Sequence, residues 1–115
     1  MVENIIFRTT LAADKFFEKQ LKAQNVDVTK IILFGSQARG NASAESDVDI
    51  VLISKDFRNK GIFKRLALIK EAEIATIKKY MIPFDVVMMT PDEFASGTSL
   101  VSEYAKKGKM ISTST

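Results

Sequence analysis

The sequence predicts an α/β (α+β) fold in which helices pack on a small mixed β-sheet. Two short β-branched apolar runs, KIILF at 30–34 and VDIVLI at 48–53, are followed by a third, FDVVMM at 84–89. A long helical pattern separates the second run from the third, which favours a right-handed parallel crossover between those strands. The first two runs are joined by a short link, which favours an antiparallel pair. A chain of 115 residues with 46% hydrophobic and 27% charged residues fits a single domain over 1–115.

The first expected element is a helix over residues 11–24, LAADKFFEKQLKAQ, with Thr9 or Thr10 as its N-cap. Its large apolar residues recur at helical spacing: Leu11, Phe17 and Leu21. The strand KIILF follows, and Gly35 ends it. The next strand, VDIVLI, is apolar on both of its alternating faces, which is typical of a strand covered on both sides.

The second helix is expected from about Gly61 to Met81, just before Pro83 opens the third strand. Apolar residues repeat along it at three- and four-residue steps: Phe63, Ala67, Ile74, Ile77 and Met81. Its basic residues are expected to form a solvated face: Lys64, Arg65, Lys70, Lys78 and Lys79. The apolar stripe of residues 62–74, IFKRLALIKEAEI, is wide enough to suggest a surface for a partner or for self-association.

The sequence TPDE at residues 90–93 predicts the start of a third helix. Thr90 would be the N-cap, Pro91 the first helical residue and Glu93 the reciprocal partner of a capping box. We expect Gly97 to interrupt this helix and Gly108 to end it with a left-handed conformation. KMIS, at 109–112, is expected to form a short fourth strand at the sheet edge.

The composition excludes several kinds of chemistry. The chain has no cysteine and no histidine, which excludes disulfides, thiolate nucleophiles, histidine bases and the usual zinc sites. A bound metal would need oxygen ligands, as Mg²⁺, Mn²⁺ and Ca²⁺ do. The net charge of +3 is a mild bias that would suit a phosphate-bearing ligand, although by itself it is better explained by a solvated basic surface. We expect a cytoplasmic protein, because no signal-peptide core or membrane-spanning run is present.

Three aspartates are predicted to meet at one end of the sheet. Asp47 and Asp49 lie two residues apart at the start of the second strand, so they point to the same side ~6.6 Å apart along the chain. Asp85 lies near the start of the third strand. Two unit charges 4 Å apart repel by about 4 kcal/mol at an effective dielectric constant of 20, so a divalent cation would stabilise the cluster.

Each aspartate by itself is more simply explained as a structural residue. An aspartate at a strand start commonly accepts hydrogen bonds from backbone N–H groups, and Arg39 or a lysine would neutralise it. The coincidence of all three in matching positions favours the cation site.

Gly35 and Ser36 form a turn at the end of the first strand. Such a turn can hold phosphate oxygens with backbone N–H groups and a hydroxyl, although an isolated Gly-Ser pair more often only ends a strand. The segment lacks the second glycine and the Lys-Ser/Thr pair of a Walker A loop. It also lacks the G-x-G-x-x-G pattern of dinucleotide-binding folds.

In combination, these motifs resemble a known family. Gly35-Ser36, ten further residues and then Asp47-x-Asp49 resemble the signature of the DNA polymerase β-like nucleotidyltransferase superfamily, and GSQARG with SDVDIVL resembles its minimal nucleotidyltransferase branch. The resemblance covers nearly the whole chain and implies the palm-like fold of that superfamily. It implies that Gly35 and Ser36 hold the β- and γ-phosphates of a nucleoside triphosphate. It also implies that Asp47 and Asp49 bind two Mg²⁺ ions, with Asp85 as the third carboxylate.

The resemblance implies a transferase that moves AMP from ATP to a hydroxyl. In that branch the acceptor can be a tyrosine of a HEPN-domain toxin, so the chain would be the antitoxin of a toxin-antitoxin system. The alternative is a module that neutralises its HEPN partner by binding alone, because the chain has no obvious second domain to hold a base or an acceptor. A nucleic-acid polymerase or tRNA-modifying enzyme is disfavoured by the short chain and the modest charge. The sequence has no motif for the base, the acceptor or the oligomeric state, and the role of Arg39 stays open between phosphate contact and structural pairing.

Overall fold

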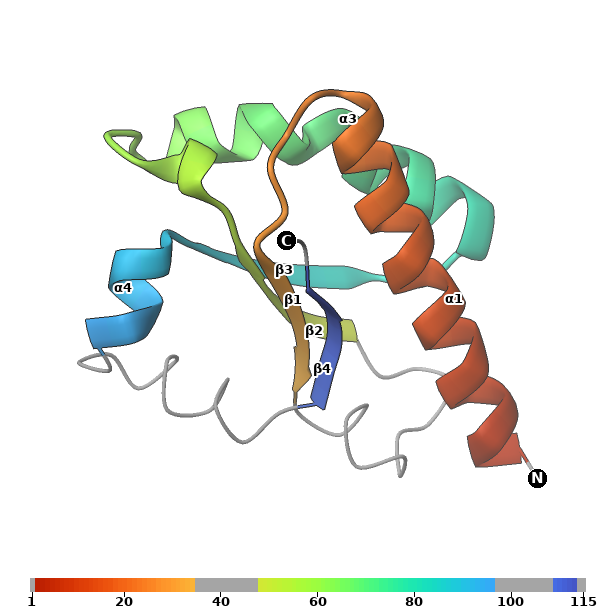
Figure 1. The fold of residues 1–115 in the computed structure, drawn as a ribbon. Coiled ribbons are helices and arrows are strands. Elements are labelled where there is room, and N and C mark those ends of the chain that lie inside the picture. Colours follow the sequence, from red (N-terminus) through yellow and green to blue (C-terminus); the bar gives the residue numbers. More distant parts are fainter. Residues whose placement is uncertain (1, 35–47, 97–108, 114–115) are drawn as a thin grey trace.

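The computed structural model describes residues 2–34, 48–96 and 109–113, and its elements follow the predicted order (Figure 1). The helices are α1 (Val2–Ala23), α3 (Ile62–Tyr80) and α4 (Pro91–Ser96), with a short 3-10 helix, η1 (Lys55–Phe57). The strands are β1 (Lys30–Phe34), β2 (Val48–Ile53), β3 (Phe84–Met89) and β4 (Lys109–Thr113). The predicted turn at Gly35, the break at Gly97 and the cap at Gly108 lie outside the described residues, as does Arg39.

The sheet has four strands in the order β3-β2-β1-β4, and it is mixed, as predicted. Strand β1 pairs with β2 in antiparallel register, from Lys30 opposite Ile53 to Phe34 opposite Asp49. Strand β3 lies parallel to β2, and α3 makes the crossover between them. Strand β4 pairs with β1 at the other edge, which confirms the prediction of an edge strand.

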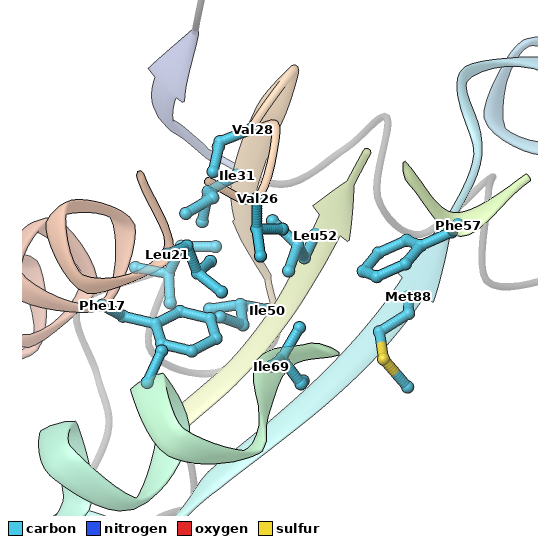
Figure 2. Close-up of a cluster of buried hydrophobic side chains, with 12 residues drawn as sticks. Phe17, Leu21, Val26, Val28, Ile31, Ile50, Leu52, Phe57, Ile69 and Met88 are labelled. Carbon is cyan, nitrogen blue, oxygen red and sulfur yellow. The ribbon is translucent and has the colours of Figure 1, made fainter. Parts of the chain in front are cut away.

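The main core lies between one face of the sheet and the two long helices α1 and α3 (Figure 2). Ile50 and Leu52 of β2 point to this face together with Ile31 of β1. Phe17 of α1 packs edge-on against Phe84, with ring centroids 5.6 Å apart. This core draws its buried residues from α1, the loop after it, β1, β2, η1, α3 and β3: Phe17, Leu21, Val26, Val28, Ile31, Leu33, Ile50, Leu52, Phe57, Ile69, Ala72 and Met88.

A smaller core covers the opposite face of the sheet, toward the C-terminal end of β2. Ile32, Val51, Ile53 and Met89 are buried there, with Val87 and Phe94 of α4 packed against them. Residues 50–53 are therefore buried on both faces of the sheet, as their continuous apolar character predicted.

Helix α1 begins at Val2, and this corrects the expectation that Thr9 or Thr10 would be its N-cap. Thr10 lies within the helix and is fully buried, on the same stripe as Ala13, Phe17 and Leu21. Residues 2–10 contain neither glycine nor proline, and the threonine follows the helical period of the core-facing side, so the helix continues through it.

Helix α3 uses only part of its apolar surface to contact the core. Ile69, Ala72 and Thr76 are its buried residues. The apolar repeat that predicted the helix lies mainly on another side: Phe63, Ala67, Ile74 and Met81 are exposed. The helix was thus predicted correctly from a periodicity that does not mark its buried face.

The capping box at the start of α4 forms as predicted. The Glu93 backbone N–H donates to Thr90 Oγ1 at 3.0 Å, and the Thr90 N–H donates to Glu93 Oε1 at 2.8 Å. Arg65 joins this box with both terminal nitrogens, donating to Glu93 Oε1 at 2.9 Å and to Glu93 Oε2 at 3.1 Å.

Arg65 was expected on a solvated face, and this expectation was wrong. Its side chain is only 14% exposed, and it also donates to the backbone oxygens of Lys60 at 2.8 Å and Met88 at 3.1 Å. A guanidinium offers five donors in a fixed plane, so it can join three backbone and side-chain partners at once. Arg65 therefore fastens α3 to the end of β3 and to α4.

Of the described helices, α1 and α3 are the longest, and neither has the apolar length needed to cross a bilayer.

Candidate active site

Asp49 and Asp85 are direct neighbours on two parallel strands. Asp49 is the second residue of β2, Asp85 is the second residue of β3, and the two are register partners. Adjacent strands lie ~4.8 Å apart, and register partners in parallel strands point to the same side of the sheet. The predicted convergence of these two aspartates at one end of the sheet is thereby confirmed.

The pair lies on the sheet face opposite α1 and α3, on the same side as α4. Side chains alternate along β2, and Ile50 and Leu52 face the helices, so Asp49 shares the opposite face with Val51. The same alternation places Asp85 on the side of Val87. Asp49 is half-buried and Asp85 is exposed. One carboxylate thus lies close to the sheet while its neighbour is accessible to a ligand.

A third carboxyl group, that of Glu73 on α3, interacts electrostatically with Asp85. Burial raises the pKa of Glu73 above its ordinary value, and the negative charge of Asp85 raises it further. Both effects disfavour a charged Glu73, because desolvation and a nearby like charge destabilise a carboxylate. The sequence analysis did not select Glu73. The sequence pattern did not show which side of α3 is buried, and Glu73 follows directly after the buried Ala72. Knowledge of that buried side was needed to select Glu73.

The remaining predicted site residues, Gly35, Ser36 and Asp47, lie outside the described residues. Residues 8–33 and 49–96, whose side chains are described, contain no cluster of three acidic residues close enough to hold a metal ion. Asp49 and Asp85 nonetheless supply two carboxylates from neighbouring strands on one face of the sheet, which is the donor chemistry that Mg²⁺ prefers. The pair therefore fits a divalent cation that has a further oxygen ligand.

A second polar region lies at the opposite end of β2, but its groups have structural partners. An open depression there is lined by Asp27, Asp56 and two lysines, Lys22 and Lys55. The Asp27 backbone N–H donates to Asp56 Oδ2 at 2.7 Å, and the Thr29 hydroxyl donates to Asp27 Oδ2 at 2.9 Å. These bonds connect the loop after α1 to the turn after β2, so we assign this region to the fold.

Comparison with known proteins agrees with the fold. The profile of the nucleotidyltransferase domain family matches residues 15–111, a span from α1 to β4. The chain therefore belongs to the nucleotidyltransferase domain family, which confirms the superfamily part of the resemblance.

Two known proteins are similar to this chain. A protein of Methanocaldococcus jannaschii named "Putative protein adenylyltransferase MJ1305" is 32% identical over 82 residues. The match covers 71% of this chain and 55% of that protein, so the chain spans about half the length of this curated relative. The crystal structure of a "putative nucleotidyltransferase" from Sulfolobus solfataricus superposes with a TM-score of 0.63 at 17% identity, covering 84% of this chain and 80% of that one. That similarity supports the fold.

Proposed function

We propose that this chain is a Mg²⁺-dependent nucleotidyltransferase that transfers AMP from ATP to an acceptor hydroxyl. The register pairing of Asp49 with Asp85 on the sheet face opposite α1 and α3 carries the proposal. The family match supports the reaction class, and the name of the archaeal relative supports adenylyl transfer to a protein.

In this proposal each site residue has a defined task. Asp49 on β2 and Asp47, the residue just before β2, bind the cations. Asp85 on β3 completes the acidic site. Gly35 and Ser36 hold the β- and γ-phosphates through a backbone N–H group and a hydroxyl. Bound Mg²⁺, with two ions expected, would neutralise charge on the triphosphate and on the leaving pyrophosphate.

The chemical step is a displacement at the α-phosphorus. The acceptor oxygen forms a bond to that phosphorus, the bond to the bridging oxygen of pyrophosphate breaks, and the acceptor proton leaves. Asp85 is the carboxylate placed to take this proton, because it is exposed beside the half-buried Asp49. Most of the rate enhancement in such a site comes from positioning and electrostatics, which strand-borne carboxylates provide.

We propose a tyrosine of a HEPN-domain partner as the acceptor, which would make the chain an antitoxin. The support is the GSQARG and SDVDIVL motifs, which resemble the minimal branch of the superfamily. A small domain that forms one wall of a cleft would obtain the other wall from such a partner.

The test uses ATP labelled on the α-phosphate or on the γ-phosphate, with the chain and a HEPN-domain protein encoded beside it. The α-label should appear on the HEPN protein in Mg²⁺ and be absent in EDTA, while the γ-label should not be retained. Asp49→Asn and Asp85→Asn should lower the rate by roughly 100-fold or more. Asp92→Asn is the matched control, because Asp92 is an exposed aspartate on α4. Full activity of Asp49→Asn would show that the site assignment is wrong.

The alternative function is neutralisation of the HEPN partner by complex formation without chemistry. The wide apolar surface of α3 favours it, because exposed apolar side chains commonly mark a protein interface. Asp49→Asn protein that still neutralises the toxin at equal concentration would support this alternative over the transferase.

A further inference from the structure

The outer side of α3 carries an apolar seam that the described residues leave uncovered. The seam consists of five apolar residues and one lysine, spaced alternately four and three residues apart: Phe63, Ala67, Lys70, Ile74, Ile77 and Met81. Phe63 is 83% exposed and Met81 is 79% exposed, and Ile77 alone among the six is half-buried. The seam is ~27 Å long, and it is separate from the stripe that α3 buries against the sheet.

The spacing of the seam matches a second helix better than a flat surface. An alternation of four and three residues has a period of 3.5, which keeps one narrow line of side chains facing a partner helix along its whole length. An interfacial membrane helix instead has a broad apolar face with a uniformly basic rim. Here one flank of the seam reads Lys64, Glu71 and Lys78, and the other reads Leu66, Glu73 and Tyr80, so an acidic residue interrupts each rim.

The charges of the seam disfavour a second copy of this chain as the occupant. In an antiparallel pair centred on Glu71, Lys64 of each copy would face Lys78 of the other, and the two Glu71 side chains would face each other. In a parallel pair, Lys70 would face Lys70 inside the seam. Like charges in contact destabilise such pairings, so the seam is complementary to a different sequence.

We propose that this seam docks a helix of a protein partner whose apolar stripe is flanked by carboxylates opposite Lys64, Lys70 and Lys78. Each of these lysines is exposed, and within the described part of the chain none of them forms an ion pair. The partner's acidic residues would supply that missing charge. Asp49 and Asp85 lie on the sheet face opposite α3, so the seam is remote from them. Figure 1 shows α3 on one side of the sheet. The proposal therefore does not rest on the proposed catalytic function.

The test is binding of two designed helical peptides of about three heptads, measured by fluorescence anisotropy. Both peptides carry leucine in the seam, and one has glutamates at the flanking positions where the other has lysines. We expect the glutamate peptide to bind at least about tenfold more tightly than the lysine peptide. Phe63→Ser and Ile74→Ser should each weaken its binding by about tenfold or more. Phe63→Ser should leave the melting temperature close to that of wild type, because the side chain is 83% exposed, and Ile74→Ser should lower it slightly, because that side chain is 41% exposed.

Matched variants separate this contact from general stickiness. Ile62→Ser removes an isoleucine that is 57% exposed but lies outside the seam, and Lys19→Glu reverses an exposed charge on α1; neither should change peptide binding. Lys64→Glu with Lys78→Glu should reverse the preference, so that the lysine peptide binds more tightly. Asp49→Asn should leave peptide binding unchanged, which separates this proposal from the catalytic one.

Three results would overturn the proposal. Equal affinity for the two peptides would exclude a charge-selected helix. Self-association of the wild-type chain that Phe63→Ser abolishes would identify a second copy as the occupant. Binding to phosphatidylcholine vesicles with about 30% phosphatidylserine, lost in Phe63→Ser while neither peptide binds, would identify a membrane surface instead.

Discussion

At the scale of single residues, Asp14 carries the clearest energetic cost in the molecule. It lies on the core-facing side of α1 with no exposed surface, and neither carboxyl oxygen has a hydrogen-bond partner among the described residues. Burial raises its pKa from the ordinary value of 3.8 to about 8. The folded protein therefore keeps a proton at neutral pH that the unfolded chain releases.

This shift predicts that stability falls as pH rises. Below pH 3.8 both states hold the proton, so Asp14 adds no pH dependence to the free energy of unfolding. Between pH 3.8 and about 8 only the folded state holds the proton, so the free energy of unfolding falls by up to about 1.4 kcal/mol per pH unit. Above about pH 8 it falls no further on account of Asp14. Asp14→Asn should thus stabilise the protein relative to wild type by about 1–3 kcal/mol more at pH 7 than at pH 5.

Urea denaturation at the two pH values measures this difference. Asp92→Asn is the control, because it removes an aspartate whose side chain is 83% exposed. A wild-type protein and an Asp14→Asn variant with the same pH dependence would contradict the assignment of a buried, protonated Asp14.

Arg65 gives a second prediction at this scale. It forms two hydrogen bonds with Glu93 and two with backbone carbonyls, and it holds the pKa of Glu93 below its ordinary value. Arg65→Ala should lower the free energy of unfolding by about 2 kcal/mol or more, because two partly buried backbone oxygens lose their donor. Arg65→Lys should recover only part of this loss. The comparison is Arg58→Ala, whose ion pair with Asp92 is exposed and 3.6 Å long and should be worth less than about 0.5 kcal/mol. Equal denaturation midpoints for Arg65→Ala and Arg58→Ala would disprove the structural role of Arg65.

At the scale of elements, the strands were predictable and the face of α3 was not. KIILF, VDIVLI and FDVVMM are short, β-branched or apolar runs bounded by turn residues, so local sequence defines them. Helix α3 has apolar residues on two sides, and only tertiary contacts with the sheet and α1 decide that Ile69 and Ala72 are buried while Ile74 is exposed. The start of α1 was missed for a related reason, since a threonine normally favours a cap and here is buried inside the helix.

The two sides of α3 can be told apart by stability. Ile69→Ala should cost about 2–4 kcal/mol, because it leaves a cavity in the main core. Ile74→Ala should cost less than about 1 kcal/mol, because the side chain is 41% exposed. Both variants replace the same residue in the same helix, so propensity cancels. Similar losses in chemical denaturation would contradict the observed orientation of α3.

At the scale of the whole molecule, the topology determines the candidate site. Asp49 and Asp85 are far apart in sequence, and they meet because a helical crossover makes β2 and β3 parallel and in register. That meeting followed from the sequence, because strand order and direction could be read from loop lengths. Glu73 could not be anticipated in the same way, since its approach to Asp85 depends on how α3 rotates on the sheet.

The central claim, that Asp49 belongs to a Mg²⁺-dependent nucleotide site, is tested most directly by calorimetric titration of ATP into the purified protein. Wild type should bind ATP in Mg²⁺ and lose this binding in EDTA. Asp49→Asn should bind at least about tenfold more weakly, and Asp92→Asn should bind as wild type does. ATP binding by Asp49→Asn that equals wild type in Mg²⁺ would contradict the account.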